Sequence, residues 1–131
     1  MSLLQTSAME LARMIRDREV SPVEVLQTHL ERVEAVNPAI NAVVHPRFDA
    51  ARAEARAAET RVMAEPADEL PPLLGVPCTI KSAFAVEGMP WDAGLTSRSG
   101  IVAQEDAVTV ARLRAAGAVC MGLTNVPEGL M

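Results

Sequence analysis

The chain has 131 residues, enough for one ordinary domain, and half of them are apolar, so a hydrophobic core is expected. Aromatic residues make up only 2%, which argues against a stacking platform for single-stranded nucleic acid, and the net charge of −5 argues against a phosphate-binding surface. No apolar run has the length of a membrane span, and no charged-then-apolar leader precedes the first helix. Composition therefore predicts a soluble, cytoplasmic protein that binds neither nucleic acid nor a membrane.

The first third of the chain predicts a pair of helices. Ser7 and Glu10 form an S-x-x-E capping box, which specifies a helix start locally. Residues 21–24 (SPVE) repeat this pattern with a proline at the first helical position. The Asn-Pro pair at 37–38 is expected to end the second helix, because a residue before proline disfavours the helical conformation. The result is a helical hairpin over about residues 7–36.

An α/β region is expected from about residue 40. Residues 40–44 (INAVV) are a short strand candidate, limited by the His-Pro pair at 45–46. A third helix follows over about 47–63, where apolar residues keep the helical period. Residues 65–72 are polar and contain prolines, which is typical of a surface loop.

The histidines and cysteines do not suggest a metal or redox site. Neither His29 nor His45 has a carboxylate or cysteine at ligand spacing, so both are interpreted as structural or solvated. Cys78 and Cys120 fall in predicted buried strands and lack C-x-x-C spacing, which favours plain core thiols. We therefore expect no metal and no cofactor.

Residues 74–81 (LGVPCTIK) are the stretch with the clearest chemical content. A turn is followed by a short apolar run of strand type, and Lys81 ends it. Such a strand is often buried on both faces, and its C-terminal end lies where an open α/β sheet usually has its binding crevice. Burial lowers the pKa of a lysine, which is how a lysine becomes a general base. The alternative is that Lys81 only marks the solvated end of a strand.

A second strand is predicted beside the first. Residues 82–105 form a long segment rich in small residues, with the only tryptophan at Trp91, and such segments are functional or disordered loops. Asp106 is expected to cap a fourth helix that ends at Gly117, and residues 118–123 read as a buried strand. Strand, helix and strand in this order predict a parallel pair. Lys81 and the Thr-Asn pair at 124–125 should then emerge at the same edge of one sheet.

Several segments together resemble the opening of an amidase-signature hydrolase. They are 21–24, 37–42, 75–81 (GVPCTIK), 106–119 (DAVTVARLRAAGAV) and 122–128 (GLTNVPE). The resemblance implies an α/β fold with a large mixed, twisted sheet flanked by helices. It also implies hydrolysis of a carbon–nitrogen amide bond in a small-molecule substrate by a Ser–cis-Ser–Lys triad, without a cofactor. Lys81 matches the catalytic lysine of the family.

The sequence departs from the family pattern in two ways. The Gly/Ser-rich loop that carries both catalytic serines in the family should follow residue 125, and no Gly-Gly-Ser-Ser-Gly-Gly pattern occurs anywhere. Ser97 and Ser99 precede the fourth helix, in the wrong order for the nucleophile, and are interpreted as loop serines. Ser82 stands where the family most often has aspartate.

We therefore expect residues 1–131 to be a truncated N-terminal portion of a single amidase-signature domain. Such a portion would be inactive by itself, because it holds only Lys81 of the triad. Exposed strand edges should make it associate with itself or with the missing C-terminal part. The alternative is a noncatalytic interaction or assembly module that uses the same scaffold. The residues do not separate an amidase from an amidotransferase component.

Overall fold

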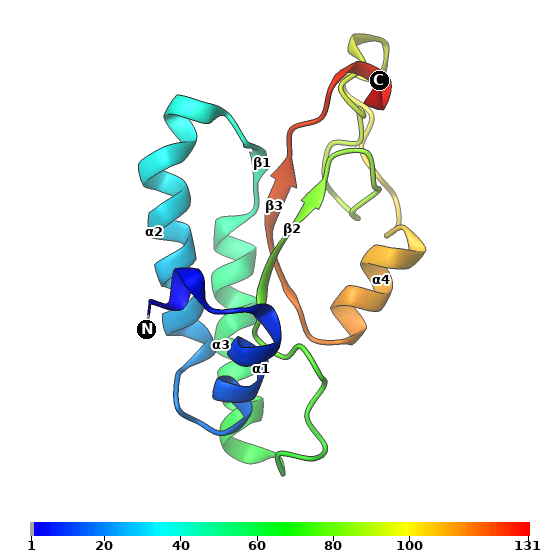
Figure 1. Cartoon of the computed structure of the whole chain (residues 1–131). Coiled ribbons are helices and arrows are strands. Elements are labelled where there is room, and N and C mark those ends of the chain that lie inside the picture. Colours follow the sequence, from blue (N-terminus) through cyan, green and yellow to red (C-terminus); the bar gives the residue numbers. More distant parts are fainter. Residues whose placement is uncertain (1) are drawn as a thin grey trace.

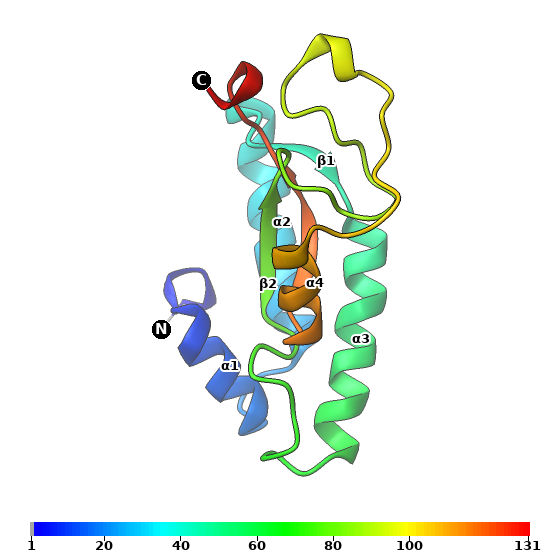
Figure 2. The same cartoon turned by 90° about the vertical axis from the view of Figure 1, so that its right-hand side faces the viewer.

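The computed structural model describes residues 2–131, which form a small mixed sheet between two layers of helices (Figures 1 and 2). The helices are α1 (Ala8–Arg16), α2 (Pro22–Ile40), α3 (Phe48–Ala64) and α4 (Val108–Ala115), and the strands are β1 (Val43–Pro46), β2 (Pro77–Lys81) and β3 (Val119–Thr124). The strand order is β1-β3-β2, with β1 antiparallel and β2 parallel to the central β3. This arrangement confirms the α/β class and the predicted parallel pair.

The two faces of β3 pack against different helices. Val119 and Met121 are buried with side chains of α2 and α3, whereas Cys120 and Leu123 are buried with Val110 of α4. Residues 119–121 alternate between the two faces, and the register shift of β2 on β3 between Cys120 and Leu123 adds one residue to β3, so Leu123 falls on the face of Cys120. Helices α2 and α3 thus lie on one side of the sheet and α4 on the other (Figure 2). The core therefore consists of two layers that meet at β3.

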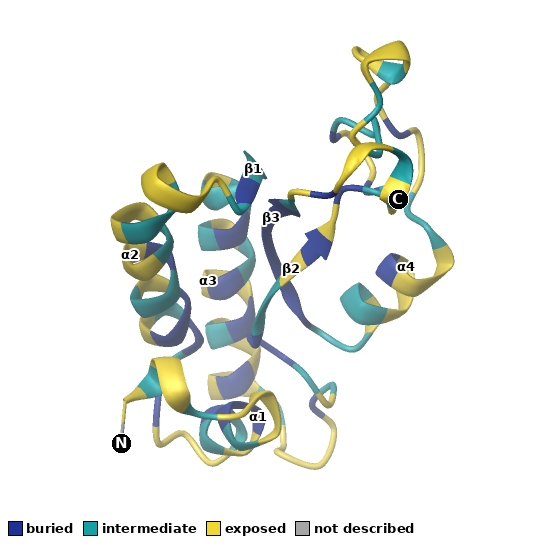
Figure 3. Cartoon of the chain, turned by 45° about the horizontal axis from the view of Figure 1, so that its top comes forward, coloured by how far each residue is buried: buried dark blue, intermediate teal, exposed yellow. Residues whose placement is uncertain are grey.

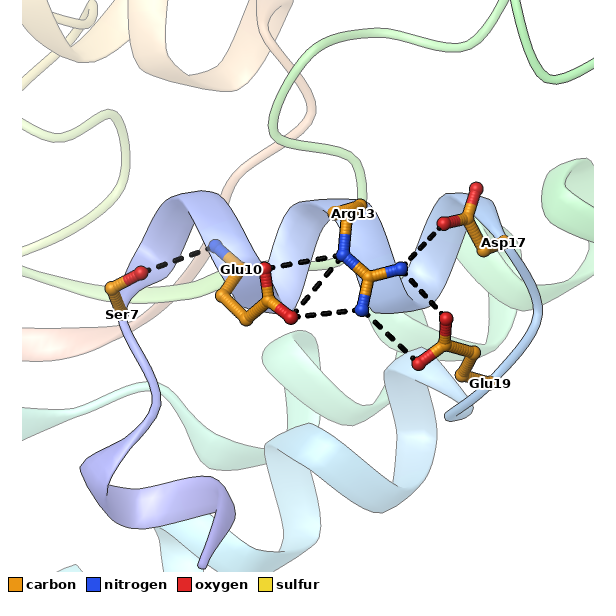
Figure 4. Close-up of polar contacts among 5 residues, drawn as sticks. All are labelled: Ser7, Glu10, Arg13, Asp17 and Glu19. Carbon is orange, nitrogen blue, oxygen red and sulfur yellow. Dashed lines mark hydrogen bonds and ion pairs between the residues drawn. The ribbon is translucent and has the colours of Figure 1, made fainter. Parts of the chain in front are cut away.

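Helix α1 begins as predicted, and an ion-pair cluster extends from the helix into the turn after it (Figure 4). The Ser7 hydroxyl accepts a hydrogen bond from the Glu10 amide at 3.2 Å. The Arg13 guanidinium contacts carboxylate oxygens of Glu10 at 2.8 Å, Asp17 at 2.7 Å and Glu19 at 2.6 Å. The hydrogen bonds from Arg13 lower the pKa of the Glu10 carboxyl below its usual value. One side chain thus links the body of α1 to the turn that leads into α2.

Helix α2 begins where the sequence predicts but ends later. The Ser21 hydroxyl accepts from the Val23 amide at 3.0 Å, and proline occupies the first helical position. The predicted end at the Asn-Pro pair is wrong, because the helix passes through Pro38 and ends at Ile40. Pro38 lies in the last turn, where its missing N–H removes a single helical hydrogen bond. Asn41 then adopts the left-handed conformation and stops the helix.

The first strand is consequently displaced from its predicted position. Residues 40 and 41 belong to the helix end, and β1 runs from Val43 to Pro46, so the His-Pro pair is part of the strand rather than its limit. Val43 pairs with Thr124 and Pro46 with Gly122 of β3. Pro46 is tolerated because β1 is an outer strand of the sheet. The third predicted helix is confirmed as α3.

The fourth helix is confirmed, but its cap is not the predicted one. Helix α4 begins at Val108, and its N-cap residue is Ala107, whose side chain makes no capping hydrogen bond. The carboxylate of Asp106 instead accepts from the Glu87 amide at 2.8 Å and contacts Arg114 at 3.1 Å. Gly117 follows the helix end with φ +91°, as expected for a glycine stop. The aspartate therefore ties the long loop to α4.

Candidate active site

Lys81 lies at the C-terminal end of β2 and is paired in register with Thr124, the last residue of β3. The prediction that Lys81 and the Thr-Asn pair at 124–125 share one sheet edge is confirmed. Lys81 is also the only lysine in the sequence, although the chain has twelve basic residues. Its residue type alone therefore sets Lys81 apart from the other basic residues, and the motif pattern does not contain this information.

The prediction that this strand is buried on both faces is wrong. Ile80 is 5% exposed, whereas Thr79 and Lys81 are both exposed. The reason is that β2 is an outer strand of the sheet. Helices α2 and α3 pack on the central strand β3, so one face of β2 stays exposed. In Figure 3, β3 is buried along most of its length and β2 mixes buried and exposed residues. Within the described residues, the lysine amine faces solvent.

The backbone around Lys81 is held on both sides. The Ser82 amide donates to the Thr124 carbonyl at 3.0 Å, and the Thr124 hydroxyl donates to the Ile80 carbonyl at 3.4 Å. The Phe84 amide donates to the Lys81 carbonyl at 2.9 Å and starts the turn after the strand. Ser82 is 2% exposed, so the residue that follows the lysine is buried.

The segment after β3 is anchored to the opposite edge of the sheet. The Asn125 amide N–H donates to the Ala42 carbonyl at 2.8 Å, and its side-chain Nδ2 donates to the Asn41 carbonyl at 3.3 Å. Glu128 is exposed in a short 3₁₀ turn. The turn thus satisfies backbone groups, and we assign neither Asn125 nor Glu128 a catalytic role.

The long segment after Lys81 folds back on itself and forms a hollow of about 620 Å³. Pro90 and Val102 form an isolated β-bridge that closes the segment. The Trp91 indole N–H donates to the Ala83 carbonyl at 2.9 Å, and the Arg98 guanidinium lies 4.6 Å from the centre of the indole ring. Trp91 therefore shapes one wall of the hollow beside the end of β2, together with apolar residues such as Phe84.

Ser97 and Ser99 are exposed residues of the 3₁₀ turn at Thr96–Arg98 and its end. Among the hydrogen bonds of residues 2–131, none joins either hydroxyl to Lys81. The structure therefore does not bring a serine hydroxyl of this loop onto the lysine.

The two histidines differ in their surroundings. His29 Nδ1 lies 2.8 Å from the Val25 carbonyl, one turn earlier in α2, in agreement with its structural interpretation. His45 Nε2 lies 3.5 Å from a carboxylate oxygen of Asp92, which the sequence did not suggest. Asp92 comes from the distant long loop, so no local spacing could have revealed this pair. Among residues 2–131, no group of three or more His, Cys, Asp or Glu side chains is placed to hold a metal ion.

The two cysteines are free thiols that pair across the sheet. Cys78 and Cys120 are register partners of β2 and β3, and Cys120 is buried while Cys78 is partly buried. Burial raises the pKa of the Cys120 thiol and raises that of Cys78 to about 11. Both are thus protonated at neutral pH, as core thiols are.

The family model for amidases matches residues 24–131 of this chain. The chain belongs to the amidase-signature family. It is 47% identical over 131 residues to fatty-acid amide hydrolase 2-A of Danio rerio, and this match covers 96% of the chain and 25% of the relative. It is 42% identical over 122 residues to an acylamidase of Rhodococcus erythropolis, covering 93% of the chain and 25% of the relative.

The fold agrees with solved structures of the same family. A bacterial aryl acylamidase of the amidase-signature enzymes superposes with a TM-score of 0.83 and 26% identity, over 95% of this chain and 26% of that one. The chain thus spans about a quarter of the length of the relatives it matches. Among residues 2–131, no helix has both the length and the apolar character that a membrane crossing requires.

Proposed function

We propose that this chain supplies the catalytic lysine of an amidase that hydrolyses the carbon–nitrogen bond of a small-molecule amide. The observation that carries the proposal is the placement of Lys81, the only lysine, at the end of β2 and in register with Thr124. Relatives of the chain include amide hydrolases, which supports the reaction class. In this proposal the triad is Ser–cis-Ser–Lys, and its two serines come from polypeptide outside this sequence.

The lysine would act as the base of an acyl transfer. A neutral Lys81 amine accepts a proton from the bridging serine, which takes it from the nucleophilic serine. The serine oxygen then bonds to the amide carbon, the C–N bond breaks, and the nitrogen leaves with a proton. Water hydrolyses the resulting ester and regenerates the hydroxyl. Because Lys81 is exposed among the described residues, the cover that keeps its amine neutral must come from the same additional polypeptide.

The outer edge of β2 supports association with that polypeptide. Strand β2 pairs with β3 on one side, and no described strand pairs with its other side. An unpaired edge exposes backbone donors and acceptors that readily accept another strand. We infer that the isolated chain is inactive and self-associates, or binds the remaining part of the domain. The free thiols of Cys78 and Cys120 fit a reducing, cytoplasmic compartment.

Two other functions are compatible with the same scaffold. The relatives also include a glutamyl-tRNA(Gln) amidotransferase component of Acidothermus cellulolyticus, 41% identical to this chain, which favours an amidotransferase as the second candidate. A noncatalytic assembly module is the third, and it would use the β2 edge without the lysine. The reading frame beyond residue 131 separates the enzymes from the module, because only the enzymes need a Gly/Ser-rich loop there.

The decisive experiment measures amide hydrolysis by the full-length protein that contains this chain. Lys81→Ala should abolish turnover, and Lys81→Arg should do the same, because arginine keeps the charge but cannot release its proton. Arg112→Ala is the matched control, since it removes an exposed basic side chain from α4 and should leave turnover unchanged. Wild-type turnover in Lys81→Arg would exclude the lysine as the base. The isolated chain should also not react with a serine-directed fluorophosphonate.

A further inference from the structure

We propose that Thr124 is the positioning residue for Lys81, and that its hydroxyl fixes the place where the lysine side chain leaves the sheet. This inference rests on the proposed function, in which Lys81 is the base. Thr124 does not touch the reacting atoms. It acts through the backbone on either side of the lysine.

Thr124 contacts both peptide groups that flank Lys81. Its carbonyl accepts from the Ser82 amide at 3.0 Å, which is ordinary pairing in a parallel sheet. Its hydroxyl donates to the Ile80 carbonyl at 3.4 Å, a contact that belongs to the side chain alone. The two contacts bracket the lysine, so rotation of this part of β2 would break one or both.

The strand needs such a contact at this point. The register of β2 on β3 shifts between Cys78 and Ile80, which marks an irregularity just before the lysine. Irregularities of this kind disrupt the ladder locally and re-aim nearby side chains. The Lys81 side chain is exposed, so packing by described residues does not fix its direction. After the shift, Ile80 pairs with Leu123 and Lys81 with Thr124, so Thr124 lies opposite the lysine in the new register.

Thr124 is itself held from the other side of the sheet. It ends the central strand, and Val43 of β1 is its register partner there. The next residue, Asn125, donates its backbone N–H to the Ala42 carbonyl at 2.8 Å. These contacts do not involve the Thr124 hydroxyl. A variant that lacks only the hydroxyl should therefore keep the strand in place while it loosens the link to β2.

The test compares two substitutions in the full-length enzyme. Thr124→Val has nearly the same shape and lacks the hydroxyl, whereas Thr124→Ser keeps it. We expect Thr124→Val to lower kcat by about tenfold to a hundredfold with little change in KM, because a displacement of about 1 Å can cost about a hundredfold in rate. The acidic limb of its pH–kcat profile should move to higher pH, because a looser lysine is better solvated as the ammonium form. Thr124→Ser should restore both properties.

The outcomes separate this inference from the proposed function. Lys81→Arg is measured beside the Thr124 variants, and turnover in that variant would overturn the proposed function. Loss of turnover in Lys81→Arg, with wild-type kcat and pH profile in Thr124→Val, would overturn only the role of Thr124. A lowered kcat that Thr124→Ser does not rescue would also overturn it, since it would show a role in packing. Thr124→Ala provides the same comparison if the valine variant does not fold.

Discussion

The side chain of Asn37 pairs with both backbone groups of Val43, although one residue is in α2 and the other starts β1. Its Oδ1 accepts from the Val43 amide at 2.8 Å, and its Nδ2 donates to the Val43 carbonyl at 2.9 Å. The side chain therefore imitates a strand partner at the point where the chain leaves the helix. This pairing explains how the helix continues through Pro38 and still enters the sheet in a defined register.

Replacing Asn37 should loosen the junction between α2 and β1. Asn37→Ala leaves the Val43 amide and carbonyl without their partner, so we expect a loss of about 1–3 kcal/mol in the free energy of unfolding. Urea unfolding followed by circular dichroism measures this loss. Gln27→Ala is the matched control, because it removes a side-chain amide of the same helix that donates to the exposed Glu31 carboxylate at 3.0 Å, and its loss should be smaller. Equal stability of the alanine variant and the wild type would contradict the structural role.

The same junction shows what local sequence patterns predict and what they miss. The helix starts at Ser7 and Ser21 were predicted because capping depends on residues within one turn. The end of α2 was missed because Asn37 makes a contact six residues along the chain, which overrides the proline signal. The predicted cap role of Asp106 is wrong for a similar reason, since its carboxylate accepts a hydrogen bond from the Glu87 amide of the long loop.

The candidate site was predicted in its position but not in its environment. The short apolar run that ends in a lysine predicts Lys81 at the end of a strand. The strand-helix-strand order predicts that this strand end lies beside Thr124, and the structure pairs the two residues. Exposure depends on which helices cover an outer strand, and no pattern within residues 74–81 contains that information. The contact between His45 and Asp92 is likewise a product of the fold of the long loop.

Gly117 should tolerate alanine far less well than Gly100, although both have left-handed backbone angles. Their φ values are +91° and +85°, so an added Cβ costs similar backbone strain at both. At Gly117 the Cβ would also lie 2.7 Å from the Leu74 Cα and 2.9 Å from the Leu74 nitrogen, whereas at Gly100 it meets nothing within 4 Å. We expect Gly117→Ala to cost about 1–3 kcal/mol more than Gly100→Ala. Thermal unfolding of both variants gives the difference, and equal costs would contradict the close approach of the α4 end to the segment before β2.

The thiol of Cys78 should react slowly with alkylating reagents in the folded chain. Burial raises its pKa to about 11, so little thiolate exists at pH 8, and the thiolate is the nucleophile. Iodoacetamide labelling followed by mass spectrometry should therefore be slow at pH 8 and accelerate strongly in denaturant. Rapid labelling of Cys78 in the folded chain would contradict its packing against the buried cluster that includes Val110 of α4.

The same raised pKa predicts a loss of stability at high pH. The unfolded thiol titrates near 9.0 and the folded Cys78 thiol near 11, so between these values the unfolded chain binds fewer protons. Stability then falls as pH rises through this window, because the slope follows the number of protons bound by the unfolded state minus the number bound by the folded state. Urea midpoints at pH 8 and pH 10.5 should differ more in the wild type than in Cys78→Ala. A pH dependence that survives the substitution unchanged would assign the effect to other groups.

Removal of Arg13 should make the α1 region less stable and less sensitive to acid. The carboxylates of Glu10, Asp17 and Glu19 share its guanidinium, and hydrogen bonds from Arg13 lower the pKa of Glu10. A lowered folded pKa gives stability that is present above the unfolded value of 4.5 and is lost as pH falls through the folded value. Arg13→Gln should lower the melting temperature at pH 7 and flatten its decline below pH 4.5.

Arg61→Gln is the matched control for the Arg13 variant. Arg61 pairs with a single carboxylate, that of Glu65, at 2.7 Å on the last turn of α3, and it likewise lowers the pKa of its partner. Exposed pairs of this kind contribute little, so its effect should be the smaller of the two. Arg13 differs because it also contacts Glu19, which lies beyond the end of α1. Between them, Arg18 has a left-handed backbone φ of +61° in the turn that connects α1 to α2. Melting curves from pH 3 to pH 7 at low and high salt test this order, and equal shifts for the two variants would show that Arg13 does not fix the turn.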